Sequence, residues 1–195
     1  MKKNLIISAL LIQCSALTYA AENDLTLQQQ YLEESQKTAQ EFMQILGKTL
    51  KTQIESSGIE SAISVCKQVA PAMAEQYSNQ SRTVKRVSLK PRNQSQGTPD
   101  EWERKTLEYF NQAQKDGQLP AKMEVSSLEK TDSGQVFRYM KAIPTQAMCL
   151  KCHGSEQDIS ANLKQLLKSE YPNDLATGYS LGEVRGAISI QHLLK

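Results

Sequence analysis

The pentapeptide Cys149-Leu150-Lys151-Cys152-His153 constrains the fold of this chain more than any other feature. Two thiols three positions apart can add to the two vinyl groups of one porphyrin, and the adjacent imidazole can then bind the iron. A chain that is attached at two points and ligates through a third has to fold around this flat group. The motif therefore predicts one covalently bound haem c, with Cys149 and Cys152 as attachment points and His153 as proximal ligand.

The Cys-x-x-Cys spacing also suits a structural zinc site or a thiol redox pair. Zinc would need two more sulfur or imidazole ligands, and outside the motif the chain has only Cys14, Cys66 and His192, which are scattered. A thioredoxin-like pair would follow a βαβ pattern, and the sequence before the motif does not have one. Haem c is favoured, while a dithiol or disulfide and a zinc site stay as alternatives.

Residues 1–20 have the three parts of a secretory signal. Lys2 and Lys3 precede a mostly apolar run over 5–17, and small residues precede an expected cut after Ala20. Removal of this segment would leave residues 21–195 as a single haem-binding domain, which we expect in the periplasm.

A membrane anchor and a lipid anchor are the alternatives to a cleaved signal. The apolar run is short for a membrane span, and Gln13 and Ser15 interrupt it. Lipidation of Cys14 would require a small residue before it, where Gln13 stands. We therefore expect no membrane span after signal removal.

The charge of the mature chain excludes some classes of partner. The chain has 23 basic and 21 acidic residues, and loss of Lys2 and Lys3 leaves 21 of each. A near-neutral chain without a basic run gives no indication of nucleic-acid binding or of an anionic membrane surface.

Cys66 is left without a partner if Cys14 is removed and the motif cysteines are haem-linked, although exported thiols are normally paired. The spacing of Ile59, Ile63, Cys66 and Ala70 places this thiol on the buried face of a second helix. Pro71 is expected to interrupt this helix near Lys67, within a turn of Cys66, or to open a new one that runs to Tyr77.

Hydrophobic spacing predicts further helices. A long amphipathic helix is expected over 24–57, and its length also makes it a candidate contact in a homodimer. Thr98 is expected to cap a helix that ends at Gly117, with Glu101 completing a capping box. Another helix is expected over 158–169.

Alternating or β-branched runs predict strands over 83–89, 122–128, 135–143 and 184–190. The second and third form a hairpin that leads into the haem motif, and a polar connection over 90–97 follows the first. Helices dominate the first half and strands the second, which predicts an α+β fold with an antiparallel sheet.

The sixth ligand of the iron has several candidates. Cys66 is favoured because it is an unpaired thiol on an apolar helix face, and a thiolate would favour ferric iron. His192 is expected just past a strand, where histidines are commonly exposed. The remaining alternatives are an open site or one of the methionines, namely Met43, Met73, Met123, Met140 and Met148.

Several segments resemble one family in the same order along the chain. They are Ala62-Ile63-Ser64-Val65-Cys66 with Ala70-Pro71, Arg86-Val87-Ser88-Leu89-Lys90-Pro91-Arg92-Asn93 with Pro99-Asp100 and Trp102-Glu103, Phe137-Arg138-Tyr139-Met140-Lys141 before the haem motif, and Gly186-Ala187-Ile188-Ser189. The family is the periplasmic c-type haem domain with a PAS-like fold, found alone or as the input domain of sensor kinases. The family's proline after the Arg-Asn pair is replaced here by Gln94, and a following asparagine by Gln96.

The resemblance implies a PAS-like antiparallel sheet flanked by helices, and one haem held between a proximal histidine and a distal cysteine. These two ligands match His153 and Cys66. Arg86, Lys90 and Arg92 are candidate partners of the haem propionates, because guanidinium groups suit carboxylates. Arg92 is the one we single out as cofactor-binding.

Two functions fit a haem protein of this kind. The first is a redox or small-ligand sensor that acts with a separate, unidentified signalling or redox partner, which rests on analogy with PAS-like folds. The alternative is a periplasmic one-electron carrier. We do not expect an enzyme, because His192 is the only other histidine that could serve as a distal acid or base.

Overall fold

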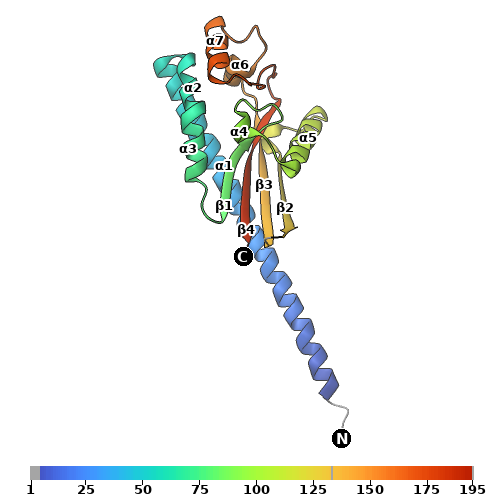
Figure 1. The fold of residues 1–195 in the computed structure, drawn as a ribbon. Coiled ribbons are helices and arrows are strands. Elements are labelled where there is room, and N and C mark those ends of the chain that lie inside the picture. The colour runs from blue at the N-terminus through green and yellow to red at the C-terminus, as the bar shows by residue number, and fades with distance from the viewer. Residues whose placement is uncertain (1–4, 133, 195) are drawn as a thin grey trace.

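The computed structural model describes residues 5–132 and 134–194 and has one antiparallel sheet at its centre (Figure 1). The strands lie in the order β1-β4-β3-β2, and every neighbouring pair is antiparallel. The strands are β1 (Arg82–Val87), β2 (Glu124–Thr131), β3 (Gly134–Pro144) and β4 (Val184–Leu194). This confirms the predicted α+β class. Lys2 and Lys3 of the predicted signal and Ser133 of the predicted hairpin turn lie outside the described residues.

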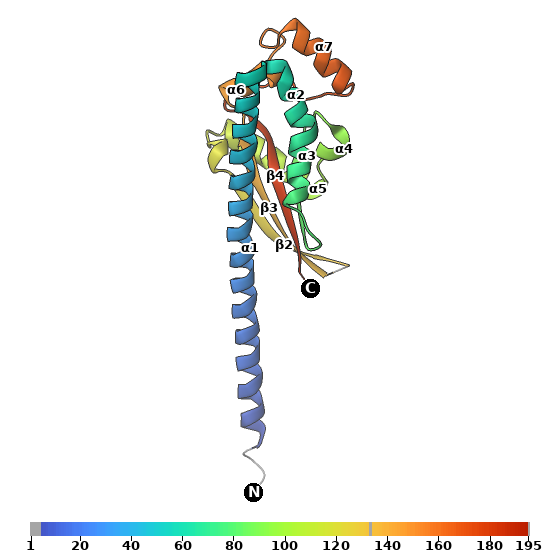
Figure 2. The same ribbon diagram turned by 90° about the vertical axis from the view of Figure 1, so that its left-hand side faces the viewer.

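The long N-terminal helix is present and begins earlier than predicted. Helix α1 spans Leu5–Ser57, whereas the prediction was 24–57. Its C-terminal part lies beside the sheet, and its N-terminal part projects well beyond it (Figures 1 and 2). The predicted cut after Ala20 therefore falls inside a continuous helix, and cleavage there stays a prediction.

Helices cover both faces of the sheet. Helices α1 and α3 (Ala70–Gln76) lie on one face, and α5 (Glu101–Lys115) lies on the other. Side chains alternate between the faces of a strand, so β4 directs Ile188 and Ile190 toward Phe42 of α1 and Ala187 toward Phe110 of α5. Two apolar cores result, one on each face of the sheet.

The start of α5 differs from the prediction. Asp100, not Thr98, is the N-cap, and Glu103, not Glu101, completes the capping box. Asp100 Oδ1 accepts a hydrogen bond from Glu103 N at 2.9 Å, and Glu103 Oε2 accepts one from Asp100 N at 2.8 Å. Thr98 instead donates its hydroxyl to Gln94 O at 2.6 Å. The sequence contains two overlapping capping-box patterns, Thr98 with Glu101 and Asp100 with Glu103, and the structure forms the second.

Other boundaries shift by a few residues. The polar connection over 90–97 contains a short helix, α4 (Gln94–Gly97), and a single helical turn, η3 (Pro120–Lys122), precedes β2. Helix α7 spans Ala161–Glu170 rather than 158–169, because Ser160 is its N-cap. Strand β4 continues past its predicted end at Ile190.

The longer β4 corrects the prediction for His192. This residue lies within the strand and is only 3% exposed, so it is not an exposed residue beyond it. Its Nε2 is 3.0 Å from Ser35 Oγ, and its ring centroid is 4.7 Å from that of Tyr31, so α1 covers it.

The remaining helices gather at one end of the sheet, at the top of Figures 1 and 2. They are η1 (Ile59–Ser61), α2 (Ala62–Ser64), η2 (Val65–Val69), α6 (Ala147–His153) and α7. Both the haem motif and Cys66 belong to this group. Among the residues described, no helix has the length and apolar character needed to cross a membrane.

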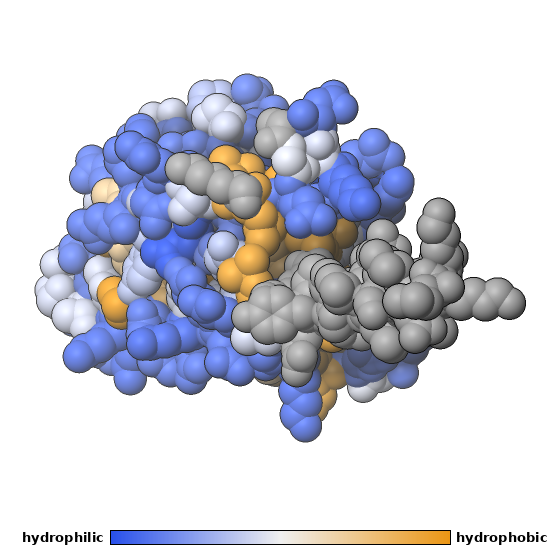
Figure 3. Space-filling model, turned by 90° about the horizontal axis from the view of Figure 1, so that it is seen from below, coloured by the Kyte–Doolittle hydropathy of each residue, from blue (hydrophilic) through white to orange (hydrophobic). Residues whose placement is uncertain are grey.

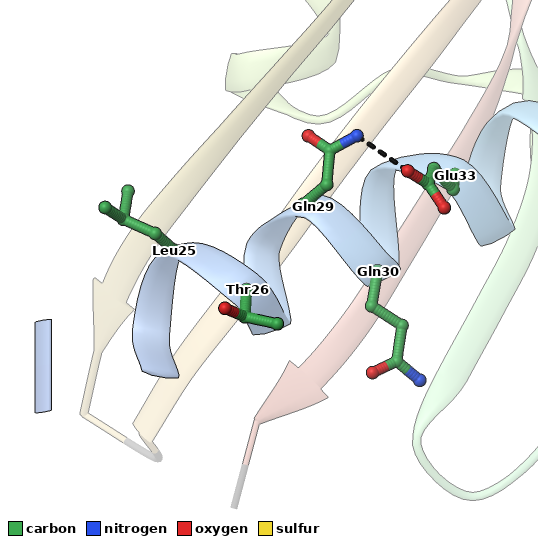
Figure 4. A pocket seen from close by; sticks show the side chains of 5 residues that line it. All are labelled: Leu25, Thr26, Gln29, Gln30 and Glu33. Carbon is green, nitrogen blue, oxygen red and sulfur yellow. Dashed lines mark hydrogen bonds between the residues drawn. The ribbon is translucent and has the colours of Figure 1, made fainter. Parts of the chain in front are cut away.

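The opposite end of the molecule carries apolar side chains and, of the predicted ligands, His192. Figure 3 views this end and shows apolar side chains among hydrophilic ones; Leu25 is 67% and Leu193 is 49% exposed. A shallow pocket on α1 is lined by Leu25, Thr26, Gln29, Gln30 and Glu33 (Figure 4). Its walls come from α1 alone, and Gln29 donates to Glu33 at 2.8 Å along the same helix.

Candidate cofactor site

Helix α6 presents the haem motif as one short unit. It spans Ala147–His153, so Cys149 and Cys152 are three positions apart on neighbouring turns and share a face. The helix ends at Gly154, where an added Cβ would lie 2.6 Å from both Leu150 O and Asp158 Oδ2. Only glycine fits this close approach, and the chain therefore turns away directly after His153.

The imidazole of His153 is fixed by a backbone carbonyl. Its Nδ1 lies 2.7 Å from Ala176 O, and since a carbonyl can only accept, Nδ1 carries the proton. The lone pair is then on Nε2, the nitrogen that is free to bind a metal. Tyr179 packs edge-on against the ring, with 6.4 Å between the centroids.

The environment of His153 keeps the imidazole neutral. Burial lowers its pKa well below the ordinary value, and the nearby guanidinium groups of Arg185, Arg92 and Arg86 lower it further, although the hydrogen bond to Ala176 opposes them. A neutral imidazole is the form that coordinates a metal.

The segment that follows α7 forms a wall beside His153. Tyr179 N donates to His153 O at 2.9 Å, and Gly178 N donates to Gly154 O at 2.7 Å. Lys90 reaches this wall from the end of β1, donating to Thr177 O, and its Nζ lies 4.4 Å from the centre of the Tyr179 ring.

Cys66 lies in a widened helical turn. Residues Val65–Val69 form a π-helical turn, and α3 follows with Pro71 in its first turn. Proline lacks an N–H group and clashes with the carbonyl four residues earlier, which a widened turn relieves. The first alternative is the closer one: the helix is distorted near Lys67, but Val69 and Ala70 keep helical φ and ψ, so no separate helix begins at Pro71. Lys67, next to Cys66, forms an ion pair with Glu170 at the end of α7, at 2.5 Å.

The fold brings Cys66 to the side of the haem motif. The thiols of Cys66, Cys149 and Cys152 are half-buried and free, and burial raises the pKa of Cys152 to about 11, with smaller contributions from the other two. Burial raises the pKa of Tyr171, and the Cys66 thiol is the next largest cause that raises it, so the Tyr171 phenol lies near this thiol. Tyr171 belongs to a small apolar cluster with Ile63 and side chains of α7.

Arg92 is a clamp within the protein. Its Nε pairs with Asp174 Oδ2 at 2.9 Å, and its Nη2 donates to Cys152 O at 2.6 Å and to Ala176 O at 3.4 Å. The side chains of Arg92 and Asp174 are nearly buried, with 9% and 11% of their surface exposed. Arg92 thus joins the end of α6 to the carbonyl that orients His153.

The other predicted ligands lie elsewhere or pack in the cores. His192 pairs with Arg82 at the far end of the sheet, away from α6. Met73, Met123 and Met140 are buried in the two apolar cores and Met43 packs against one of them. Met148 is half-buried on α6 itself. Of the candidates outside α6, Cys66 is therefore the one that the fold brings next to the motif.

Sequence reasoning missed four residues of this site: Tyr171, Asp174, Tyr179 and Arg185. Tyr171, Asp174 and Tyr179 lie between the end of α7 and the start of β4, and Arg185 is the second residue of β4. No motif marks any of the four. The last of the family-like segments begins one residue after Arg185, and that proximity is the one signal that points toward it.

The residues at this end of the sheet fit an iron porphyrin. They offer two thiols on one helix face, an imidazole with a free Nε2, a third thiol nearby, and several cations. A bare metal ion fits less well, because within residues 5–132 and 134–194 no three His, Cys, Asp or Glu side chains are grouped as its ligands.

Comparison with known proteins gives one family and one solved structure. The sequence profile of the Tll0287-like family matches residues 18–192. The crystal structure of the cyanobacterial haem protein Tll0287 has a similar fold, with a TM-score of 0.61 and 20% sequence identity, over 85% of this chain and 96% of that chain. Among curated protein sequences none matches the chain.

Proposed function

The chain belongs to the Tll0287-like family, and from this premise we propose that it is an exported protein with one covalently bound haem c. The observation that carries the proposal is the hydrogen bond between His153 Nδ1 and Ala176 O, next to two thiols on the same short helix. This bond leaves Nε2 available, as in histidines that ligate iron. The structurally similar Tll0287 is itself a haem protein, which supports the same cofactor here.

Four residues would hold the group. Cys149 and Cys152 would form the thioether bonds, His153 would be the proximal ligand, and Cys66 would be the sixth ligand. When bound, haem c supplies an iron centre that exchanges one electron. A PAS-like character of the sheet remains a prediction from the resemblance.

The surrounding side chains would position the proximal ligand and keep water from it. Arg92 holds the Cys152 and Ala176 carbonyls together, so the imidazole has one orientation. Tyr179 closes one side of His153, and burial keeps the ring neutral.

A redox or small-ligand sensor is the role we favour. Cys66 lies in a π-helical turn, and such turns are frequent at functional sites because the extra residue weakens the helical hydrogen bonding. A ligand on a weakened turn would leave the iron more easily, and its release would couple the oxidation state or ligand binding of the iron to the conformation of this helix. The output would pass to a separate protein partner.

A one-electron carrier is the second candidate. The thiols of Cys149 and Cys152 are only half-buried, which would leave the attached edge of the haem near the surface. A near-neutral surface offers such a carrier little electrostatic steering.

Location, association and catalysis are part of the same proposal. We expect the periplasm as the location, and a homodimer through the projecting part of α1 as an association to test by light scattering. We expect no enzyme activity, because the charged groups that shift the pKa of His153 are arginines, and His192 lies at the far end of the sheet.

The test is a redox titration of the exported protein followed by its absorption spectrum. We expect a covalent haem band, a low-spin spectrum and a negative midpoint potential that rises in Cys66→Ala, because a thiolate stabilises ferric iron. Ser64→Ala, an exposed change on the preceding turn, is the matched control.

Two outcomes would contradict parts of this proposal. Absence of a covalent haem band in the wild type would exclude haem c. A spectrum and potential that ignore Cys66→Ala would exclude Cys66 as the sixth ligand and favour the carrier.

A further inference from the structure

Arg185 is a half-buried cation that forms no ion pair among the described residues. Its Nε is buried and has no hydrogen-bond partner among the described residues. Its Nη1 donates to Ser88 Oγ at 3.0 Å and lies 3.5 Å from Lys90 O, and its guanidinium carbon lies 5.2 Å from the centre of the Tyr179 ring. A buried polar atom without a partner costs free energy unless something else satisfies it.

A β-bulge directs this side chain to the site. Ile143 of β3 pairs with Gly186 and Pro144 pairs with Val184, so Arg185 is an extra residue on β4. Bulges re-aim a side chain and are common beside functional sites. Gly186 allows the distortion, because an added Cβ there would lie 2.4 Å from Val87 O.

The charges around Arg185 are predominantly of one sign. Burial lowers the pKa of Arg185 most, and Tyr179 opposes this effect. Arg92 and Arg86 lower the pKa further, and Asp174, which also opposes them, is already paired with Arg92. Among the described residues, neither Arg185 nor Arg86 forms an ion pair. An excess of positive charge in this half-buried region near His153 favours the binding of an anion.

We propose that Arg185, and not Arg92, is the main protein partner of a carboxylate in this site, and that this carboxylate is a propionate of the bound haem. The inference rests on the proposed haem function. Arg92 already uses its Nε and Nη2 within the protein, whereas the Nε of Arg185 is a buried donor without a partner among the described residues. The Arg185 guanidinium lies against Tyr179, whose ring also packs against His153. Guanidinium groups bind carboxylates through paired donors, which suits this role.

The experiment compares Arg185→Gln, Arg185→Lys and wild type as haem-loaded proteins. Removing a positive charge beside the iron favours the oxidised form, so we expect Arg185→Gln to shift the ratio of oxidised to reduced protein at least tenfold, which corresponds to about 59 mV for one electron. Arg185→Lys should retain most of the wild-type potential. Arg104→Gln removes the same charge from an exposed pair on α5 and should leave the potential unchanged.

A second readout separates carboxylate binding from a structural role. The propionate bending vibration in resonance Raman spectra should shift in Arg185→Gln and not in Arg104→Gln. An Arg185 that only holds Ser88 and Lys90 would lower the unfolding temperature of Arg185→Gln without moving the potential or this vibration, and that result would overturn the inference.

The source of the carboxylate is tested by titrating acetate at constant ionic strength. A propionate is carried by the haem, so the wild-type potential should not respond. A potential that follows acetate in the wild type and not in Arg185→Gln would assign the site to a free anion and overturn our assignment. Absence of covalent haem in the wild type would instead be a failure of the proposed function.

Discussion

Arg92 and Asp174 form the most buried ion pair near the candidate site, and they give a prediction for stability. Removing one partner of a buried pair leaves the other charge uncompensated, so we expect Arg92→Ala to lower the free energy of unfolding by about 3 kcal/mol. Chemical denaturation of the haem-loaded protein measures this value.

The control for this prediction is Arg104→Ala, whose pair with Glu108 is exposed and should contribute no more than about 0.5 kcal/mol. The double variant Arg92→Ala/Asp174→Ala should lose less than the two single changes together, because it leaves no unpaired charge. Equal losses of unfolding free energy in Arg92→Ala and Arg104→Ala would show that the buried Arg92–Asp174 pair stabilises the fold no more than an exposed pair does.

Single residues of the site were predictable only where local chemistry marks them. The spacing of Cys149, Cys152 and His153 has a chemical meaning in any fold. The unpaired Cys66 was found by counting the cysteines that remain after signal removal and haem attachment. Arg185 could not be found, because its orientation depends on a bulge that exists only when β4 pairs with β3.

The start of α5 gives a prediction for a single element. Asp100→Ala should lower the free energy of unfolding by about 1 kcal/mol, since it removes the side chain that caps Glu103 N. Thr98→Ala removes the cap that the sequence suggested and should change it by less than about 0.5 kcal/mol. Thermal unfolding of both variants decides between the two capping patterns, and a larger loss in Thr98→Ala would contradict the structure.

The same carboxylate predicts a pH dependence. Burial raises the pKa of Asp100, but the hydrogen bond from Glu103 N and the Arg138 guanidinium outweigh burial, so the pKa lies below the ordinary 3.8. A lowered folded pKa contributes stability that is present above 3.8 and is lost as the pH falls through the folded value.

Asp100→Asn keeps a capping side chain but cannot titrate. We expect the gap in unfolding temperature between wild type and Asp100→Asn to narrow as the pH falls from about 6 to about 3. A constant gap over this range would show that the charge of Asp100 does not contribute.

Elements were more predictable than their ends. Periodic apolar positions are local, so the helices α1, α5 and α7 and all four strands were found. Boundaries depend on which of several polar side chains bonds to the backbone, as Asp100 and Ser160 do here. The strand order was not predictable, because it joins segments that are far apart in sequence.

The whole chain gives a prediction for processing. If residues 1–20 are a signal, the exported protein begins at Ala21 and its mass includes one haem. Intact-mass spectrometry of the periplasmic form measures both at once. A mass that retains residues 1–20 would instead favour the anchor that we considered as the alternative.

The place of β4 in the sheet has a consequence for biogenesis. This strand follows β1, β2 and β3 in the sequence, yet it lies between β1 and β3, so the sheet cannot close until β4 has been synthesised. For an exported chain, as we propose, β4 must also have crossed the membrane. The segment 149–153 emerges before β4 does. We therefore expect a time window in which both motif thiols are still accessible to the haem attachment machinery, and the arrival of the final strand ends it.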